Sequence, residues 1–256
     1  MEKFPNQPEF LLISEFGALS SGKVAVIPNI RDAFEGKAQF SDLKSKVLSS
    51  SFKWPNSISV IPQDVFPGIN AIVVPDGFLP PGKTDGNIYV LKTDLQSQEV
   101  LYQISPHKSG FFYHTGVWVD IDGDGRKDYL TARSNAQAGQ GELVWYRHPT
   151  DGLLTTPWPE TIITKGPDVM FDLANVQGHD NSFIVFGAEF FNHKLSVYQI
   201  GKGDGKLMMS RVIDDSIDQV YSVKYMDIDN DGKYELLVNN HETDNSKAAI
   251  FLYDVP

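Results

Sequence analysis

Apolar and polar positions alternate in short runs along the chain, and one kind of run recurs five times. The five copies are GKVAVIPN from Gly22, GNIYVLKT from Gly86, GELVWYRH from Gly141, HKLSVYQI from His193 and AAIFLYDV from Ala248. Each is rich in β-branched and aromatic residues, which favour strands. Their third positions are spaced by 64, 55, 52 and 55 residues. This spacing indicates a structural repeat of about fifty residues.

Further apolar runs surround each copy and complete the repeating unit. One precedes it, as in AIVVP and DYLTA, and the third and fifth units add GVWVD and YSVKYMD ahead of that run. An outer run follows, as in ETIIT and SRVID, and Asp-Gly turns separate the runs. Each unit therefore predicts four antiparallel strands with two apolar faces. Such sheets must pack against copies of themselves, which predicts an all-β fold, a β-propeller of four-stranded antiparallel blades.

The repeat also predicts the domain organisation. We expect a single propeller domain over residues 1–256, with blades at roughly 9–54, 55–109, 110–166, 167–218 and 219–256. The first unit lacks an inner strand before Phe10, and the last lacks an outer strand. Two arrangements fit these ends: a five-bladed ring closed by pairing of the chain ends, or six or seven blades in a longer native chain. We expect five blades.

Charge and composition restrict the class of partner. The net charge of -11 disfavours nucleic acids and anionic membranes, which are bound chiefly through Lys and Arg. No stretch approaches the roughly 18 apolar residues of a membrane span, and the N-terminal residues lack the apolar core of a signal peptide. The chain has no cysteine, so no disulfide framework forms. We expect no nucleic-acid partner and no membrane insertion, and the sequence leaves the oligomeric state open.

Two acidic loops nearly repeat each other, DIDGDGRKDYL from Asp120 and DIDNDGKYELL from Asp227. Carboxylates at alternate positions and a glycine at the sixth suit a hard divalent cation such as Ca²⁺, which takes six to eight oxygens. Plain Asp-Gly turns share this composition, but two copies 107 residues apart favour cation loops. We expect two Ca²⁺ sites. The predicted ligands are the carboxylates of Asp120, Asp122, Asp124 and Asp128 with the carbonyl of Arg126, and those of Asp227, Asp229, Asp231 and Glu235 with the carbonyl of Lys233.

These loops are not EF-hands. Position twelve holds Thr131 and Val238 in place of the bidentate Glu, and strands flank the loops in place of helices. The pattern D-x-D-x-D-G-x-x-D/E between the inner two strands of a blade resembles the FG-GAP/VCBS propellers, the integrin-α-like repeats. The resemblance covers the chain from about residue 55. It implies that calcium is structural and that ligands bind at one end of the ring, as in lectins, adhesion modules and appendages of carbohydrate-active enzymes.

Charged and imidazole side chains follow successive strands at the end of the blades opposite the acidic loops. There they could converge on an axial funnel and bind a ligand. The candidate ligand-binding residues are Asp76, His114, Arg133, Glu189 and His241. Aromatic residues nearby could form a sugar-stacking wall, or could pack between blades. They are Phe111, Phe112, Tyr113, Trp118, Phe190 and Phe191.

The sequence leaves three functions open, and no nucleophile motif narrows them. The first, which we favour, is a lectin-like, calcium-stabilised binding module for a carbohydrate or protein ligand, which is not an enzyme. The second is a metal-dependent carbon–oxygen lyase or dehydratase, with an additional divalent metal held in the funnel by His114, Glu189, His241 or Asp76 and with Arg133 gripping an oxygen. The run GELVWYRHP is similar to fungal aldos-2-ulose dehydratases. The third is a scaffold without a ligand. The calcium loops favour an extracellular location.

Overall fold

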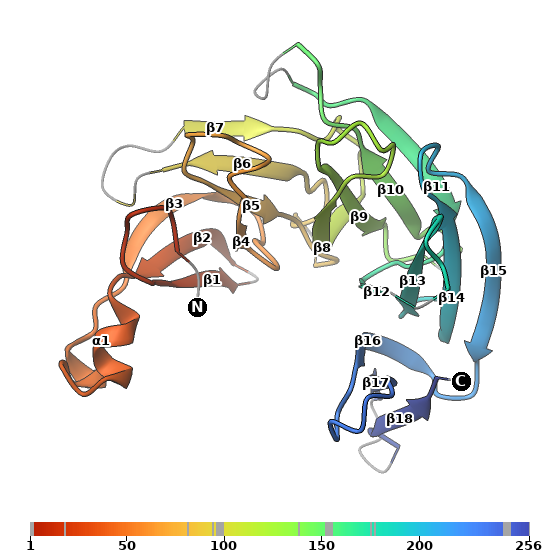
Figure 1. The fold of residues 1–256 in the computed structure, drawn as a ribbon. Helices are drawn as coiled ribbons and strands as arrows, with labels where there is room; N and C mark the ends of the chain where they lie inside the picture. Colours follow the sequence, from red (N-terminus) through yellow and green to blue (C-terminus); the bar gives the residue numbers. More distant parts are fainter. Residues whose placement is uncertain are drawn as a thin grey trace. The chain divides into compact units, whose positions relative to one another are not determined.

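The computed structural model describes residues 3–17, 19–80, 82–93, 95, 100–137, 139–151, 156–174, 176, 178–242 and 247–255. Within these residues the strands form five antiparallel sheets that follow one another in chain order (Figure 1). Three sheets have four strands, and the first and last have three. The fold is therefore all-β and of the five-bladed β-propeller class. The predicted fold class and blade count are confirmed.

The first two sheets come from the N-terminal part of the chain. The first contains β1 (Leu11–Gly17), β2 (Ser20–Ile27) and β3 (Lys46–Phe52). The second contains β4 (Ser59–Val60), β5 (Ala71–Pro75), β6 (Ile88–Lys92) and β7 (Val100–Gln103). The short helix α1 (Ile30–Phe34) and the 3₁₀ turn η1 (Phe40–Asp42) separate β2 from β3.

The other three sheets follow in the same way. The third contains β8 (Phe112–Val119), β9 (Asp128–Ser134), β10 (Glu142–Tyr146) and β11 (Glu160–Lys165). The fourth contains β12 (Met170–Ala174), β13 (Ser182–Glu189), β14 (Lys194–Gly201) and β15 (Leu207–Asp214). The last contains β16 (Gln219–Met226), β17 (Glu235–His241) and β18 (Ile250–Asp254).

The chain divides into two compact units. The first contains residues 1–114 and 148–159, and the second contains residues 115–147 and 160–256. The predicted organisation as a single domain, with the blade ranges given above, stays a prediction. No helix in the described part of the chain is long and apolar enough to cross a membrane.

Each unit has its own apolar core, made where sheets pack face to face. In the first unit Phe10 and Val26 pack with Ile72 and Leu91 of the second sheet. In the second unit, residues of β9 and β10 pack against β13 and β14, and the opposite face of β13 packs against β16 and β17. Central strands are thus buried on both faces, and every residue of β9 and of β10 is buried. Polar side chains on such strands must find partners inside the protein.

Candidate metal loops and buried polar clusters

Both acidic loops lie where the sequence places them, between the inner two strands of a sheet. One joins β8 to β9 and the other joins β16 to β17, and both belong to the second unit. The closing acids, Asp128 and Glu235, are the first residues of β9 and β17 and are buried. Each loop is therefore anchored by a carboxylate inside the sheet.

In the first loop, backbone N–H groups hold the carboxylates. Asp120 accepts hydrogen bonds from the N–H of Gly123 at 2.8 Å and of Gly125 at 2.9 Å. Asp128 accepts one from the N–H of Ile121 at 3.1 Å. Gly123 and Gly125 have φ values of 75° and 86°, a backbone region that suits glycine. The turn thus folds back on its own first residue.

The second loop repeats the bonds of the sixth and ninth positions, but its first residue accepts from the fifth residue where Asp120 accepts from the fourth. Asp227 accepts from the N–H of Asp231 at 3.1 Å and of Gly232 at 3.0 Å, and Glu235 accepts from the N–H of Ile228 at 3.0 Å. Asn230, which corresponds to Gly123, has a φ of 61°, in the same left-handed region. The two loops therefore share their conformation as well as their sequence pattern.

Three carboxylates converge in each loop. Asp120, Asp122 and Asp128 each bring one oxygen into a group whose members lie within 4.8 Å of one another, and Asp227, Asp229 and Glu235 do the same. In the described part of the chain these are the groups of three or more acidic or histidine side chains with this spacing. The additional divalent metal predicted for the funnel has no such group among those residues.

The fifth-position acids differ from their neighbours. Asp124 accepts hydrogen bonds from the N–H of Arg126 at 2.9 Å and from its guanidinium, which lowers the pKa of the Asp124 carboxyl. Asp231 accepts from the N–H of Lys233 at 2.8 Å. Asp124 and Asp231 lie outside the converging groups, and their predicted role as ligands, like that of the carbonyls of Arg126 and Lys233, stays a prediction.

Asp76, a predicted ligand-binding residue, instead holds the backbone of a neighbouring segment. It is 2 % exposed, and its carboxylate accepts from the N–H of Lys53 at 3.1 Å and of Trp54 at 2.7 Å. Burial raises the pKa of the Asp76 carboxyl, and this effect outweighs the two N–H donors, which lower it. Asp168 forms the same arrangement in the second unit, accepting from the N–H groups of Phe190 and Phe191, and burial raises its pKa to about 7. The repetition indicates a structural role for both.

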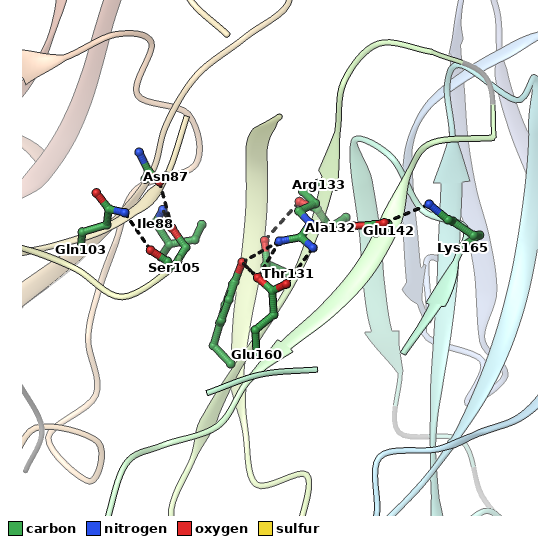
Figure 2. A network of polar contacts seen from close by, with 11 residues as sticks. Asn87, Ile88, Gln103, Ser105, Thr131, Ala132, Arg133, Glu142, Glu160 and Lys165 are labelled. Atoms are coloured by element: carbon green, nitrogen blue, oxygen red, sulfur yellow. Dashed lines mark hydrogen bonds and ion pairs between the residues drawn. The ribbon is translucent and has the colours of Figure 1, made fainter. Parts of the chain in front are cut away.

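Arg133 is 1 % exposed and lies in a network of carboxylates (Figure 2). Its Nε donates to Glu142 at 2.8 Å, and its Nη1 and Nη2 donate to Glu160 at 2.6 and 2.9 Å. Lys165 donates to the other oxygen of Glu142 at 2.9 Å. Arg133, Glu142 and Lys165 are cross-strand neighbours on β9, β10 and β11, so one row of the sheet alternates in charge. The sequence analysis missed Glu142 and Glu160, although acids inside apolar strands signal a buried partner.

The remaining candidates have separate surroundings. Glu189 is 1 % exposed and accepts from the hydroxyl of Tyr198 and from Asn192 at 2.8 Å. His114 packs edge-on against Phe78, and burial lowers its pKa to about 4. His241 is exposed, with Nδ1 3.1 Å from Gln219. Asp76 and His114 belong to the first unit, whereas Arg133, Glu189 and His241 belong to the second, each with different partners. Their predicted role in one ligand site stays a prediction.

Comparisons with known proteins give only structural matches. No protein-family model and no curated protein matches the sequence. Similar solved structures include a β-xylosidase (TM-score 0.46, 10% identity, 90% of this chain and 82% of that one). An α-L-arabinofuranosidase from Lactobacillus brevis has a TM-score of 0.47 and 9% identity, covering 96% and 86%. A compost-metagenome GH43 β-xylosidase/α-arabinofuranosidase, in complex with xylotriose and in calcium-free form, has a TM-score of 0.45 and 11% identity, covering 93% and 80%.

These matches correct three expectations. The three structures are glycoside hydrolases and not FG-GAP/VCBS proteins, so the resemblance to that family is wrong. The two expected functions, a non-enzymatic binding module and a metal-dependent lyase, are wrong for the same reason, as is the expectation that the chain is not an enzyme. Short Asp-Gly calcium loops can arise in unrelated propellers, because only local geometry is needed to form them. At 9–11% identity no residue role is transferred from the hydrolases.

Proposed function

We propose that the protein binds two Ca²⁺ ions, one in each acidic loop. The observation that carries the proposal is the repeated geometry: three carboxylate oxygens within 4.8 Å of one another in each loop, on the same backbone hydrogen bonds. Oxygen-only donors and a flexible turn suit Ca²⁺ better than zinc or copper, which favour nitrogen and sulfur. Asp120, Asp122 and Asp128 would hold one ion, and Asp227, Asp229 and Glu235 the other.

The bound ions would stabilise the two hairpins that carry the acidic loops. Without a cation, three carboxylates within 4.8 Å repel one another, and the repulsion opposes closing the hairpin. A bound ion turns the repulsion into attraction and fastens the loop to the first residue of β9 or β17. Because the open chain has no such site, the binding free energy would add to the stability of the folded protein.

The test counts ions and assigns them to loops. Calorimetric titration of the calcium-free protein should give two sites, and Asp122→Asn or Asp229→Asn should each remove one. Asp204→Asn, in an exposed turn of the same unit, is the matched control and should leave both. Retention of two sites in the Asp122→Asn/Asp229→Asn double variant would refute the assignment.

A second candidate concerns carbohydrate, and a strip of stacked rings in the first unit favours it. Phe16 and Trp54 have ring centroids 4.4 Å apart, and Trp54 and Phe78 have centroids 5.2 Å apart, with interplanar angles of 23° and 21°. Phe16 is 52 % exposed, so the strip presents aromatic surface to solvent. The C–H face of a sugar ring packs well on such surface.

The carbohydrate candidate is tested by activity and by binding. Aryl xylosides, aryl arabinofuranosides and xylo-oligosaccharides are suitable probes, since they cover the classes named for the similar solved structures. Trp54→Ala should weaken turnover or binding, while Phe34→Ala, which removes an exposed ring elsewhere in the unit, should not. Equal effects of the two variants, or no activity and no binding with any probe, would remove this candidate.

A further inference from the structure

A small polar cavity in the second unit has no role in either proposal. Its volume is about 150 Å³. Lys165 borders it from the end of β11, Lys194, Ser196 and Tyr198 from β14, and Ser210 and Arg211 from β15. All its charged lining residues are cationic, in a chain of net charge -11.

The register of the strands explains why these groups share one face. Lys194, Ser196 and Tyr198 alternate along β14, so their side chains point to the same side of the sheet. Ser210 is the cross-strand partner of Tyr198 and joins that face. Arg211 pairs with Val197, whose side chain points to the opposite face, so the exposed Arg211 borders the cavity from the edge strand β15 without joining the face of Lys194, Ser196 and Tyr198.

Both lysines are held in place by buried carboxylates. Lys165 donates to Glu142 at 2.9 Å, and Lys194 lies 3.4 Å from Glu189. Glu142 and Glu189 are 4 % and 1 % exposed, so each fixes the position of one ammonium group. An ammonium group has three N–H donors, and one carboxylate contact leaves donors for a further acceptor.

The acidic and basic side chains around the cavity are joined in ion pairs. Glu142, Glu160 and Glu189 are matched in number by Arg133, Lys165 and Lys194, with which they form ion pairs. Asp168 is a further buried carboxylate next to this group, where it interacts with Glu189 and Tyr198. Lys165 and Lys194 are therefore the cations that face the cavity, and a bound anion would share them with the carboxylates that hold them.

An unsatisfied hydroxyl lies in the same cavity. Ser196 is 3 % exposed, and its Oγ is buried without a hydrogen-bond partner in the described part of the chain. A buried hydroxyl without a partner costs about 1–3 kcal/mol, so such groups are ordinarily satisfied by protein, water or ligand. Ser196 Oγ can donate to an oxygen that the two lysines also attract.

We propose that this cavity binds a small oxyanion, the sulfate, phosphate or carboxylate group of a ligand. The volume corresponds to about five water molecules, enough for one such group. Lys165 and Lys194 supply charge-assisted hydrogen bonds, and Ser196 and Ser210 supply hydroxyl donors. The anion is either a free inorganic ion or a group carried by a larger molecule such as an acidic sugar.

The experiment is calorimetric titration of the calcium-loaded full chain with sodium sulfate, sodium phosphate and glucuronate, at constant ionic strength. We expect saturable binding of at least one probe. Lys194→Gln should weaken it about tenfold or more, the loss expected for one charge-assisted hydrogen bond. Lys206→Gln, which removes an exposed lysine of the turn between β14 and β15, outside the cavity, is the matched control and should bind as the wild type does.

Ser196→Ala separates binding from folding. The variant removes a hydroxyl without a partner, so the melting temperature without anion should stay the same or rise, while anion affinity falls. Tighter binding of glucuronate than of sulfate or phosphate would identify a carboxylate carried by a sugar, and the reverse a free ion. Saturable binding of no probe, or equal affinity in Lys194→Gln and Lys206→Gln, would overturn the proposal.

Discussion

At the scale of single residues, the buried charges of this protein are satisfied in pairs and rows. Arg133 uses three nitrogens on two carboxylates, and Glu142 receives one cation on each oxygen. Such groups add little net stability compared with well-packed apolar residues, but removing one partner leaves the remaining charges buried and uncompensated. A single substitution in such a network should therefore lower the free energy of unfolding substantially.

Replacing Arg133 should therefore be costly. Arg133→Met keeps much of the volume but leaves Glu142 and Glu160 without their main cation, and should lower the free energy of unfolding by about 3–5 kcal/mol. Urea unfolding monitored by circular dichroism measures the change. Arg31→Gln, at an exposed ion pair with Glu9, is the control and should change little. A loss in Arg133→Met no larger than that of the control would contradict the role of the network.

His114 should make stability depend on pH. Burial lowers its pKa to about 4 from an ordinary value of 6.5, so the unfolded chain binds the proton more readily than the folded one. The neutral ring supports the fold above pH about 6.5, and this support is lost as the pH falls toward 4. The shift corresponds to about 3 kcal/mol.

The variant His114→Gln removes this titration. The free energy of unfolding, measured at pH 7 and pH 5, should fall less in the variant than in the wild type. Other groups titrate over the same range, among them Asp168, so the comparison rests on the difference between the two proteins. A wild-type loss equal to that of His114→Gln would show that His114 is not the group responsible.

At the scale of elements, the acidic hairpins depend on a left-handed residue at the sixth position. Gly232 has a φ of 86°, and nothing lies within 4 Å of the Cβ that an alanine would add. Gly232→Ala should thus cost about 1 kcal/mol from backbone conformation alone, and weaken calcium binding because Gly232 N–H holds Asp227.

Gly36→Ala is the matched control for this prediction. Gly36 has a φ of 73° and equally open surroundings, but belongs to the first unit, whereas both acidic loops belong to the second. It should lose similar stability in calcium-free buffer without losing calcium affinity, as measured by calorimetric titration. Unchanged calcium affinity in Gly232→Ala would contradict the link between the turn and the site.

The hairpins also show what the sequence could predict. The repeated strands and both loops follow from local patterns, since alternation and turn glycines act over a few neighbouring residues. The partners of Asp76 could not be predicted: its carboxylate holds the N–H groups of Lys53 and Trp54, more than twenty residues earlier, with no local signal. The partner of Arg133 could not be predicted for the same reason, because Glu160 lies 27 residues later in the chain.

At the scale of the whole molecule, the proposed calcium sites are distributed unevenly. Both acidic loops belong to the second unit, and in the described part of the first unit no comparable group of carboxylates lies within 4.8 Å. Two Ca²⁺ ions would also reduce the net charge from -11 to -7, since each adds two positive charges. Removing calcium should therefore affect the second unit more than the first.

Hydrogen exchange with and without a chelator measures this difference. Chelation should speed exchange in β8, β9, β16 and β17, whose hairpins lose their cation, and should leave β1, β2, β5 and β6 close to their calcium-loaded rates. The Asp122→Asn/Asp229→Asn double variant should reproduce the pattern in the presence of calcium. Uniform acceleration through both units would indicate that the cations stabilise the molecule as one cooperative structure, and would contradict a stabilisation confined to the second unit.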